Sequence, residues 1–375
     1  VRRSFKFRLH PNTSQECVLD GWRRQCCSLG NAALEQRIIA WKSQRKSITR
    51  FDQTAQLTEL RGADPAWAAV PVEVQRSALR RVDLAFQAFF RRCRSGEVPG
   101  FPRFRSHRRY DSFALGTVKV KKDRVHIPKL GHVKMNLHRP ITGTIKNAIV
   151  RRDACGKWWV TIQCDLGPAP PKVAITSSVG IDLGLEALAT LSTGEKIENH
   201  RFLRRAEAEL ADRQRQLARA KKGSRNRERA RILVAQSHAK IVNQRLDHAR
   251  KEAKKIVDRF DLIAHEKLNV RGLARGMFAK SFCDASWGLL LRCLASKAEE
   301  AGKHLVPIDP RNTSKLCSRC DEIVDKTLAD RTHDCPNCGL MIDRDHNAAI
   351  NVLARGQRAL ELEQSNDEGK VSRVI

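Results

Sequence analysis

The sequence predicts a multidomain α+β protein in which strand-rich and helical segments alternate along the chain. Short runs that alternate apolar and polar residues, typical of strands, occupy residues 2–9 and recur through residues 112–166. Apolar residues spaced three or four positions apart predict amphipathic helices over residues 15–50, 72–94 and 201–260, the last broken near residues 223–224. The Pro- and Gly-rich segment 167–172 between these groups indicates a linker.

The composition indicates a polyanionic partner. The 375 residues include 71 Lys and Arg against 41 Asp and Glu, a formal net charge of +30. This charge excludes the surface of an ordinary metabolic enzyme and favours nucleic acid. No apolar run reaches the roughly 18 residues that a membrane span needs, and the first ten residues lack the apolar stretch of a secretory signal. We therefore expect a cytoplasmic protein without a membrane partner.

The first half of the chain offers candidate nucleic-acid contacts. Residues 2–9 alternate basic and apolar side chains, which predicts a strand with one cationic face. Residues 72–94 place an apolar stripe on a helix whose arginines face outward. In the Pro- and Gly-containing loop that follows, basic and aromatic residues interleave, which suits backbone contact and base stacking; the candidates are Arg103, Phe104 and Arg105.

A single acid stands in a buried-type strand of the second half. Asp182 lies between Gly180 and Gly184, and two more strand-like runs follow as a meander. Such a meander with a carboxylate in its first strand is typical of the opening of an RNase H-like nuclease. One alternative is an aspartate that caps a turn. Another is the phosphate loop of an actin-like ATPase, which needs a second aspartate-and-glycine loop and a glycine-rich adenosine loop, and the sequence offers neither.

Further acids stand at the edges of other predicted core elements. Glu266 ends a second short apolar strand, and Asp343 and Asp345 precede an apolar helix. Taken singly, Glu266 could pair with Lys267 at the surface, and either aspartate could be a helix N-cap. Taken together on a basic chain, three such carboxylates are what a two-metal phosphodiesterase needs, because Mg²⁺ prefers carboxylate oxygens.

Two C-x-x-C pairs form the most specific motif of the sequence. Fourteen residues separate the pairs, and the four thiolates can surround one Zn²⁺ tetrahedrally; they are Cys317, Cys320, Cys335 and Cys338. An iron–sulfur or redox site is less favoured, because the sequence has no third cysteine pair and no thioredoxin-like context. With four sulfur ligands the site is closed, so we expect a structural zinc ion.

In combination, these motifs resemble the RuvC nuclease signature of the TnpB family. The resemblance rests on GIDLG, HEKL, DPRNTSKLCSRC, CPNCG and DRDHNAAIN, which together span residues 179–356. The opening FKFRLHPN and the segment GFPRFRS are also similar to the family's amino-terminal half. The resemblance implies that the catalytic acids are Asp182, Glu266 and Asp345, which hold two Mg²⁺ ions. Asp343 is then the neighbour or the helix cap.

The resemblance also implies an architecture and a function. A wedge domain with a β-barrel is interrupted by a helical recognition domain, and a RuvC domain follows with an inserted zinc ribbon. The expected boundaries are residues 1–14 and 111–172 for the wedge with its linker, 15–110 for the recognition domain, 173–312 and 341–356 for RuvC, 313–340 for the ribbon, and 357–375 for a disordered tail.

The implied activity is RNA-guided cleavage of double-stranded DNA beside a short transposon-adjacent motif. Its partners are a guide RNA and the target DNA, in a prokaryotic cytoplasm and at the nucleoid when the protein is bound to DNA. Two alternatives stay open, a catalytically silent RNA-guided DNA-binding protein and a protein-only transposase or recombinase with the same nuclease fold.

Overall fold

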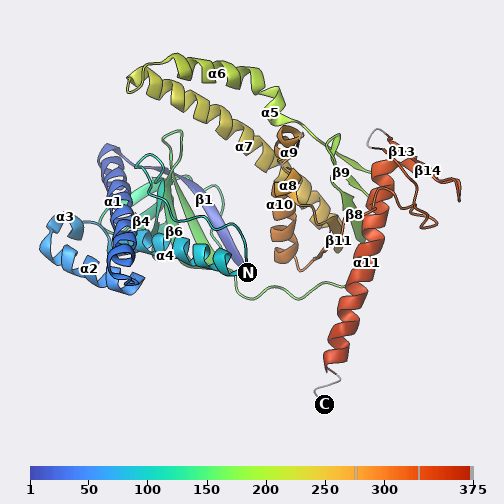
Figure 1. Cartoon of the computed structure of the whole chain (residues 1–375), viewed down its shortest axis with the longest axis horizontal. Coiled ribbons are helices and arrows are strands. Elements are labelled where there is room, and N and C mark those ends of the chain that lie inside the picture. Colours follow the sequence, from blue (N-terminus) through green and yellow to red (C-terminus); the bar gives the residue numbers. More distant parts are fainter. Residues whose placement is uncertain (274, 277, 328–329, 372–375) are drawn as a thin grey trace. The chain divides into compact units, whose positions relative to one another are not determined.

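The chain is a mixed α+β protein of two compact units. The computed structural model describes residues 1–371 apart from residues 274, 277 and 328–329. Unit 1 comprises Val1–Gly167 and unit 2 comprises Pro168–Ile375; Figure 1 labels their helices and several of their strands. No helix within the described residues combines the length and hydropathy that crossing a bilayer requires.

Unit 1 is built on a seven-stranded antiparallel sheet in the order β2-β6-β7-β1-β5-β4-β3. Strand β1, the first along the chain, pairs with β7, with Arg2 opposite Asp165 at one end and Leu9 opposite Trp158 at the other. The alternation of the sequence puts Phe5, Phe7 and Leu9 into the core. The strands are β1 (Arg2–His10), β2 (Ser112–Leu115), β3 (Lys119–Lys121), β4 (Arg124–Ile127), β5 (Gly131–Met135), β6 (Thr144–Arg152) and β7 (Trp158–Asp165).

The helices of unit 1 are α1 (Thr13–Gln44), α2 (Arg50–Ala63), α3 (Pro65–Ala68) and α4 (Val72–Arg94). The last of these coincides with the predicted helix over residues 72–94. The helix predicted for residues 15–50 ends earlier, because Arg45 takes a left-handed conformation with φ 54°. A new capping box between Thr49 and Asp52 then starts α2. Helix α1 buries Leu19, Trp22 and Cys26 in the same core as the sheet.

Unit 2 is built on a five-stranded sheet in the order β10-β9-β8-β11-β12. The strands β10, β9 and β8 form an antiparallel meander, whereas β8, β11 and β12 run parallel. The strands are β8 (Ser178–Asp182), β9 (Ala187–Leu191), β10 (Lys196–Glu198), β11 (Leu262–Glu266) and β12 (His304–Ile308), and a separate two-stranded sheet joins β13 (Thr332–Asp334) to β14 (Met341–Asp343).

Helices cover both faces of this sheet. Val179 and Ile181 of β8 share a core cluster with residues of α7 (Arg225–Arg259) and α10 (Trp287–Glu300). Gly180, which points the other way on the same strand, lies against α11 (Arg344–Val371). The remaining helices are α5 (Phe202–Arg205), α6 (Glu207–Arg219), α8 (Val270–Leu273) and α9 (Ala279–Ala285).

Helices α6 and α7 form an antiparallel hairpin that extends beyond the sheet of unit 2 (Figure 1). The turn between them contains Gly223, whose φ is +85°, a conformation that glycine adopts without strain. Ser224 then caps α7 by accepting a hydrogen bond from the backbone N–H of Arg227.

Helix α11 continues as far as Val371, through most of the segment that the sequence predicted to be a disordered tail. Residues 357–362 are mostly strong helix formers. Within them, Ala359 and Leu360 pack against a small apolar cluster that includes Leu262 and Val352. Tertiary packing thus extends the helix where the sequence suggested fraying. Residues 372–375, which the same prediction covered, lie outside the described residues.

Candidate functional site

Two parallel strands of unit 2 bring Asp182 and Glu266 to one edge of the sheet. In the pairing of β8 with β11, His265 lies opposite Ile181, so the next residues along the two strands are Asp182 and Glu266. Neighbouring strands are about 4.8 Å apart. Side chains in matching register on parallel strands also point to the same face of the sheet, so the strand pairing places the two carboxyl groups next to each other.

Helix α11 supplies Asp345 from its first turn. A Cβ atom placed on Gly180 would lie only 2.1 Å from the carbonyl oxygen of Ala349, so the helix rests on the bare backbone of β8. Asp182 is two residues further along the strand, and Asp345 is about one turn towards the start of the helix. Accordingly, a Cβ atom on Gly184 would lie 3.9 Å from Oδ2 of Asp345.

The three carboxyl groups repel one another electrostatically. Asp182 and Glu266 are 8% and 6% exposed. Burial, reinforced by the negative charges of Glu266 and Asp345, raises the pKa of Asp182 well above its usual value. Burial also raises the pKa of Glu266, although a hydrogen bond from Thr313 opposes this rise. Such mutual repulsion favours a site that gains a cation.

Two basic side chains offset part of this negative charge. The Arg344 guanidinium donates to Oδ1 of Asp345 over 3.0 and 3.1 Å. Lys196 donates to Asp343 over 2.7 Å. The other oxygen of Asp343 accepts from the backbone N–H groups of Asp345 and His346, both over 3.0 Å, so Asp343 is the N-cap of α11.

Two buried asparagines of α11 attach the first cysteine pair to the acidic site. The Asn351 side chain donates to the carbonyl oxygens of Thr313 and Leu316 over 2.9 and 2.7 Å. Asn347 donates to the same Leu316 carbonyl over 2.7 Å and accepts from the N–H of Ser318 over 3.0 Å. Thr313 in turn donates its hydroxyl to Oε1 of Glu266 over 2.7 Å.

Sequence reasoning missed Thr313, Asn347 and Asn351 as parts of the site. The only available signal is the spacing of the two asparagines, i and i+4, which places them on one face of a helix. The alanines between them, Ala348 and Ala349, are fully buried. The start of α11 therefore combines a carboxylate, two asparagines that bind the loop with the first cysteine pair, and small residues that let the helix approach the sheet.

The four cysteines form a compact cluster. Sulfur atoms of Cys317 and Cys338, and of Cys320 and Cys335, lie 3.6 Å apart. All four sulfur atoms lie within 4.8 Å of one another. Four sulfurs placed tetrahedrally at about 2.3 Å from a zinc ion would be about 3.8 Å apart. The donor set and its spacing therefore fit a structural zinc ion.

Among the described residues, only the four cysteines form a group of three or more His, Cys, Asp or Glu side chains whose ligand atoms all lie within 4.8 Å of one another. The oxygens of Asp182, Glu266 and Asp345 are not grouped as tightly. Their chemistry nevertheless fits hard divalent cations, because carboxyl groups from three separate elements lie close enough to influence one another's charge, and two of them are buried.

The candidate nucleic-acid residues of unit 1 lie on an exposed loop that α1 fastens. Arg103, Phe104 and Arg105 are exposed, the phenyl ring to 56%. Asn31 of α1 both donates to and accepts from the backbone of Arg105, over 2.8 and 2.9 Å. These three side chains come from one loop and are not part of the acidic site in unit 2.

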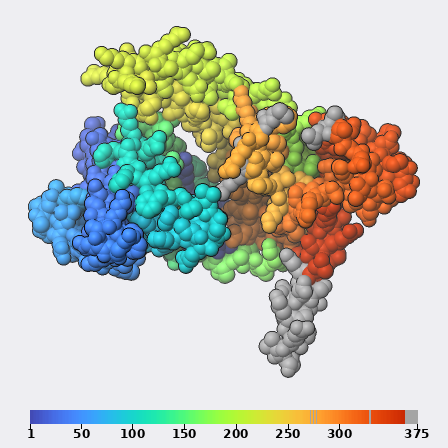
Figure 2. Space-filling view, viewed as in Figure 1, coloured from blue at the N-terminus to red at the C-terminus, as the bar shows by residue number. Residues whose placement is uncertain are grey.

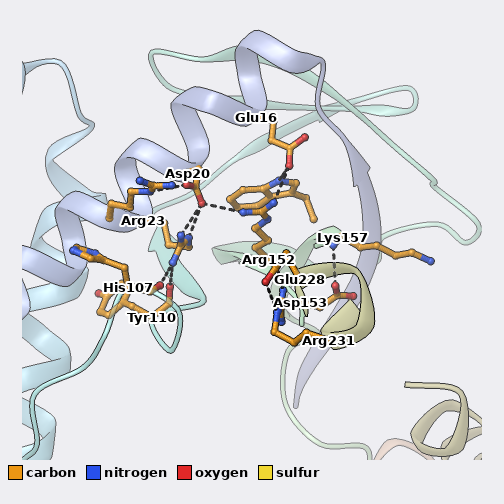
Figure 3. Close-up of polar contacts among 12 residues, drawn as sticks. Glu16, Asp20, Arg23, His107, Tyr110, Arg152, Asp153, Lys157, Glu228 and Arg231 are labelled. Atoms are coloured by element: carbon orange, nitrogen blue, oxygen red, sulfur yellow. Dashed lines mark hydrogen bonds and ion pairs between the residues drawn. The ribbon is translucent and has the colours of Figure 1, made fainter. Parts of the chain in front are cut away.

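A buried arginine holds the end of the same loop (Figure 3). Arg23 is 7% exposed. It donates to the carbonyl oxygens of Tyr110, over 2.7 Å, and His107. Asp20 accepts from Arg23 over 2.7 Å and from Arg152 of β6 over 3.3 Å. Arg23 and Asp20 therefore connect α1 to both the loop and the sheet.

A cationic groove that the sequence did not reveal lies between α2, α4 and the sheet of unit 1. Its volume is about 530 Å³. Phe51, 75% exposed, lies at its edge with the Arg50 guanidinium 5.1 Å from the ring centre. Asn147 also lines it, and its buried side-chain oxygen accepts no hydrogen bond from any described residue. The other cations of the groove are Arg76, Arg80 and Arg81.

Comparison with protein families identifies two segments. Residues 161–277 match the OrfB family of IS605 elements, described as "Probable transposase". Residues 287–352, which contain the four cysteines, match the TNB domain of Cas12f1-like proteins. The two matches together cover the three acids and the cysteine cluster.

Curated relatives and a solved structure agree with these matches. A Streptomyces pristinaespiralis protein described as "Putative RNA-guided DNA endonuclease" is 34% identical, over 96% of this chain and 90% of the relative. InsQ of Escherichia coli K12, described in the same words, is 28% identical over 98% of this chain and 96% of its own length. A Cas12f1–sgRNA–target DNA complex has the same fold, with a TM-score of 0.58 and 13% identity over 94% of this chain and 98% of that protein. The chain therefore belongs to the TnpB (OrfB) family of RNA-guided DNA endonucleases of IS605-type transposons, which is related to Cas12f.

Proposed function

We propose that this chain uses a guide RNA to cut double-stranded DNA beside a short transposon-adjacent motif, by Mg²⁺-dependent hydrolysis of phosphodiester bonds. The observation that carries this proposal is the meeting of Asp182, Glu266 and Asp345 from β8, β11 and α11. A binding protein that does not cut has no use for three mutually repelling carboxyl groups, two of them buried.

The strand order of unit 2, with an antiparallel meander continued by two parallel strands, supports an RNase H-like nuclease domain. In this domain Asp182, Glu266 and Asp345 would hold two Mg²⁺ ions. When bound, these ions would activate the attacking water and stabilise the leaving oxygen. Thr313 fixes the orientation of Glu266, and Arg344 restrains Asp345. Cys317, Cys320, Cys335 and Cys338 would hold one zinc ion that stabilises the fold without joining the reaction.

Unit 1 would hold the nucleic acids through its two cationic surfaces. We assign residues 1–14 and 111–172 to a wedge barrel and residues 15–110 to a recognition domain. The loop with Arg103, Phe104 and Arg105 would contact the guide RNA, since exposed cations beside an aromatic ring suit single-stranded segments. The groove at Phe51 and Asn147 would contact DNA, because the arginines that line it suit a phosphate backbone.

The test is to purify the protein with its co-purifying RNA, sequence that RNA, and incubate the complex with plasmids. One plasmid carries a sequence that matches the guide segment, placed beside a randomised flank, and the other carries a scrambled sequence. We expect linearisation of the matching plasmid alone, with a selected flank, in Mg²⁺ and not in EDTA. Equal cleavage of both plasmids would contradict guidance by RNA. Binding of the matching plasmid without cleavage would contradict the nuclease assignment.

A further inference from the structure

Positive charge is concentrated at the tip of the α6–α7 hairpin, which comprises residues 213–231. Residues 213–231 contain nine lysines and arginines against one glutamate, a net charge of +8 in nineteen residues. The hairpin, coloured yellow-green in Figure 2, stands out from the rest of unit 2. Its charge is therefore carried on an arm rather than on the body of the unit.

Some of these cations maintain the hairpin. Arg227 donates to the carbonyl oxygens of Leu217 and Ala220 over 2.8 Å, which closes the end of α6. Arg213 donates to the hydroxyl of Ser237 over 2.8 Å, which ties α6 to α7. These two arginines are half-buried, and their role is structural.

Other cations at the tip are exposed and form no ion pair within the described chain. They are Arg219, Lys221, Lys222, Arg225 and Arg229. Like charges at this density repel one another and reduce the stability of the free protein. Among the described residues of unit 2, no acid pairs with any of these five side chains, so an external polyanion is the partner that the surface fits.

The tip lacks the side chains that bind single strands. No Phe, Tyr or Trp occurs in residues 203–259. Proteins that hold single-stranded nucleic acid stack its bases on aromatic rings. A cationic surface without aromatic rings instead suits the phosphate backbone of a double helix.

The shape of the tip favours an A-form helix over B-form DNA. Two packed helices are about 20 Å wide, because one helix with side chains measures roughly 10–12 Å. The major groove of B-DNA, about 12 Å wide, admits one helix. Double-stranded RNA is bound largely from outside, through phosphates and hydroxyls along its grooves. Most of the cations at the tip are arginines, whose planar groups bind phosphate with two hydrogen bonds.

We propose that the α6–α7 tip binds the phosphate backbone of a double-stranded stem in the guide RNA. The choice of RNA rests on the proposed RNA-guided function, whereas the duplex-binding surface rests on the hairpin alone. The arm would thus hold the RNA in place whether or not a DNA target is bound.

The test measures binding of the full protein, freed of its RNA, to a labelled RNA stem of about 16 base pairs in EDTA, which prevents cleavage. The tip variant replaces four cations with alanine: Lys221, Lys222, Arg225 and Arg229. The matched control replaces four exposed cations of unit 1 with alanine and lowers the net charge equally: Lys119, Lys121, Lys122 and Arg124. Circular dichroism checks that both variants stay folded.

We expect the tip variant to bind the RNA stem at least tenfold more weakly. The slope of its binding constant against salt concentration, on logarithmic scales, should fall by an amount that corresponds to about three phosphate contacts. Both changes should be much smaller in the control. Equal losses in both variants would show a net-charge effect and overturn the proposal. A larger loss for a DNA duplex of the same sequence than for the RNA stem would also overturn it. Because the binding assay involves no cleavage, its result does not depend on whether the protein cuts guided DNA.

Discussion

Thr313 shows how one hydroxyl can orient a carboxyl group that we propose to be catalytic. It is 2% exposed and donates to Glu266 over 2.7 Å. Replacing it with valine keeps the side-chain shape but removes the hydrogen bond, worth about 1.4 kcal/mol, so we expect the Thr313→Val variant to cleave about tenfold more slowly. Single-turnover cleavage of guided plasmid measures this rate.

Thr313→Ser is the matched control for this prediction. It restores the donor, and we expect a rate close to that of the natural protein. If the valine and serine variants cleave equally fast, Thr313 does not orient Glu266.

Gly180 illustrates a requirement set by close packing. A Cβ atom at this position would lie 2.1 Å from the Ala349 carbonyl oxygen and 2.6 Å from the Leu353 nitrogen. Because neither backbone can yield easily, we expect Gly180→Ala to lower the free energy of unfolding of unit 2 by about 3 kcal/mol. Thermal unfolding followed by circular dichroism tests this value.

Gly288→Ala is the companion variant in the same unit. A Cβ atom there meets only the end of the Arg292 side chain, at 3.8 Å. We expect unchanged or slightly higher stability, since alanine is the better helix former. An equal loss of stability in both glycine variants would mean that the contact with α11 is not the cause.

For single residues, the sequence indicated which side chains could carry the chemistry, but not which residues they contact in the fold. Asp182 and Glu266 could be proposed because acids are rare in buried strands. Asp345 lies in the first turn of a helix, where acids are common, and was singled out by the resemblance to the TnpB family. The hydrogen bond from Thr313 could not be foreseen, because the pair is 47 residues apart along the chain. Nothing in the sequence indicated that Gly180 admits a helix against the strand.

At the scale of elements, the cysteine cluster joins the acidic site through α11. The loop that carries Cys317 is bound by Asn347 and Asn351 of that helix. Removing the metal with a strong chelator should therefore lower the melting temperature of unit 2 and the cleavage rate together, because metal binding contributes to folding. Zinc analysis of the purified protein should give one ion per chain.

The Cys335→Ser variant should reproduce the effect of the chelator, whereas Cys93→Ser, a change at an exposed cysteine outside the cluster, should not. A protein that keeps its melting temperature after complete removal of zinc would contradict a structural role for the ion.

Asp261 connects three segments of unit 2 and makes its stability depend on pH. The carboxyl group accepts from Lys303 over 2.5 Å and from Thr176 and Ser177 over 2.7–3.0 Å. The Lys303 ammonium group, followed by the Thr176 hydrogen bonds, holds the pKa of Asp261 far below its usual value. The stabilisation is thus complete above the unfolded pKa of about 4 and is lost as the pH falls towards the folded pKa.

We expect Asp261→Asn to melt at a lower temperature than the natural protein at pH 5–7, with a difference that shrinks below about pH 4. Asp258→Asn, which alters only an exposed pair with Lys254, should change the melting temperature little. Melting curves over this pH range test the claim. A difference that stays constant down to pH 3 would show that the charge of Asp261 is not responsible.

Elements with a strong local pattern were predicted well, and those fixed by tertiary contacts were not. The apolar stripe of α4 predicted its bounds, Val72–Arg94. The break between α1 and α2 depends on the left-handed Arg45 and was not foreseen. The C-terminal extension of α11 depends on Leu360 packing against β-strand residues that are far away in the sequence.

For the whole molecule, the proposed function depends on three acids from distant parts of the chain acting as one metal-binding site. Residues 182, 266 and 345 come together only because β8 and β11 pair in parallel and α11 crosses them at Gly180. The net charge of +30, which we propose holds nucleic acid, does not depend on this site. Cleavage and binding should therefore be separable by substitution.

The most direct measurement is single-turnover cleavage of guided plasmid by Asp182→Asn, Glu266→Gln and Asp345→Asn, with binding of guide RNA and target DNA measured in parallel. Asp258→Asn, at an exposed position on α7, is the control. We predict a loss of at least about 1,000-fold in rate, roughly 4 kcal/mol, for each of the three, with binding retained. Cleavage at a normal rate by any one of them would contradict the claim that these carboxylates form the catalytic site.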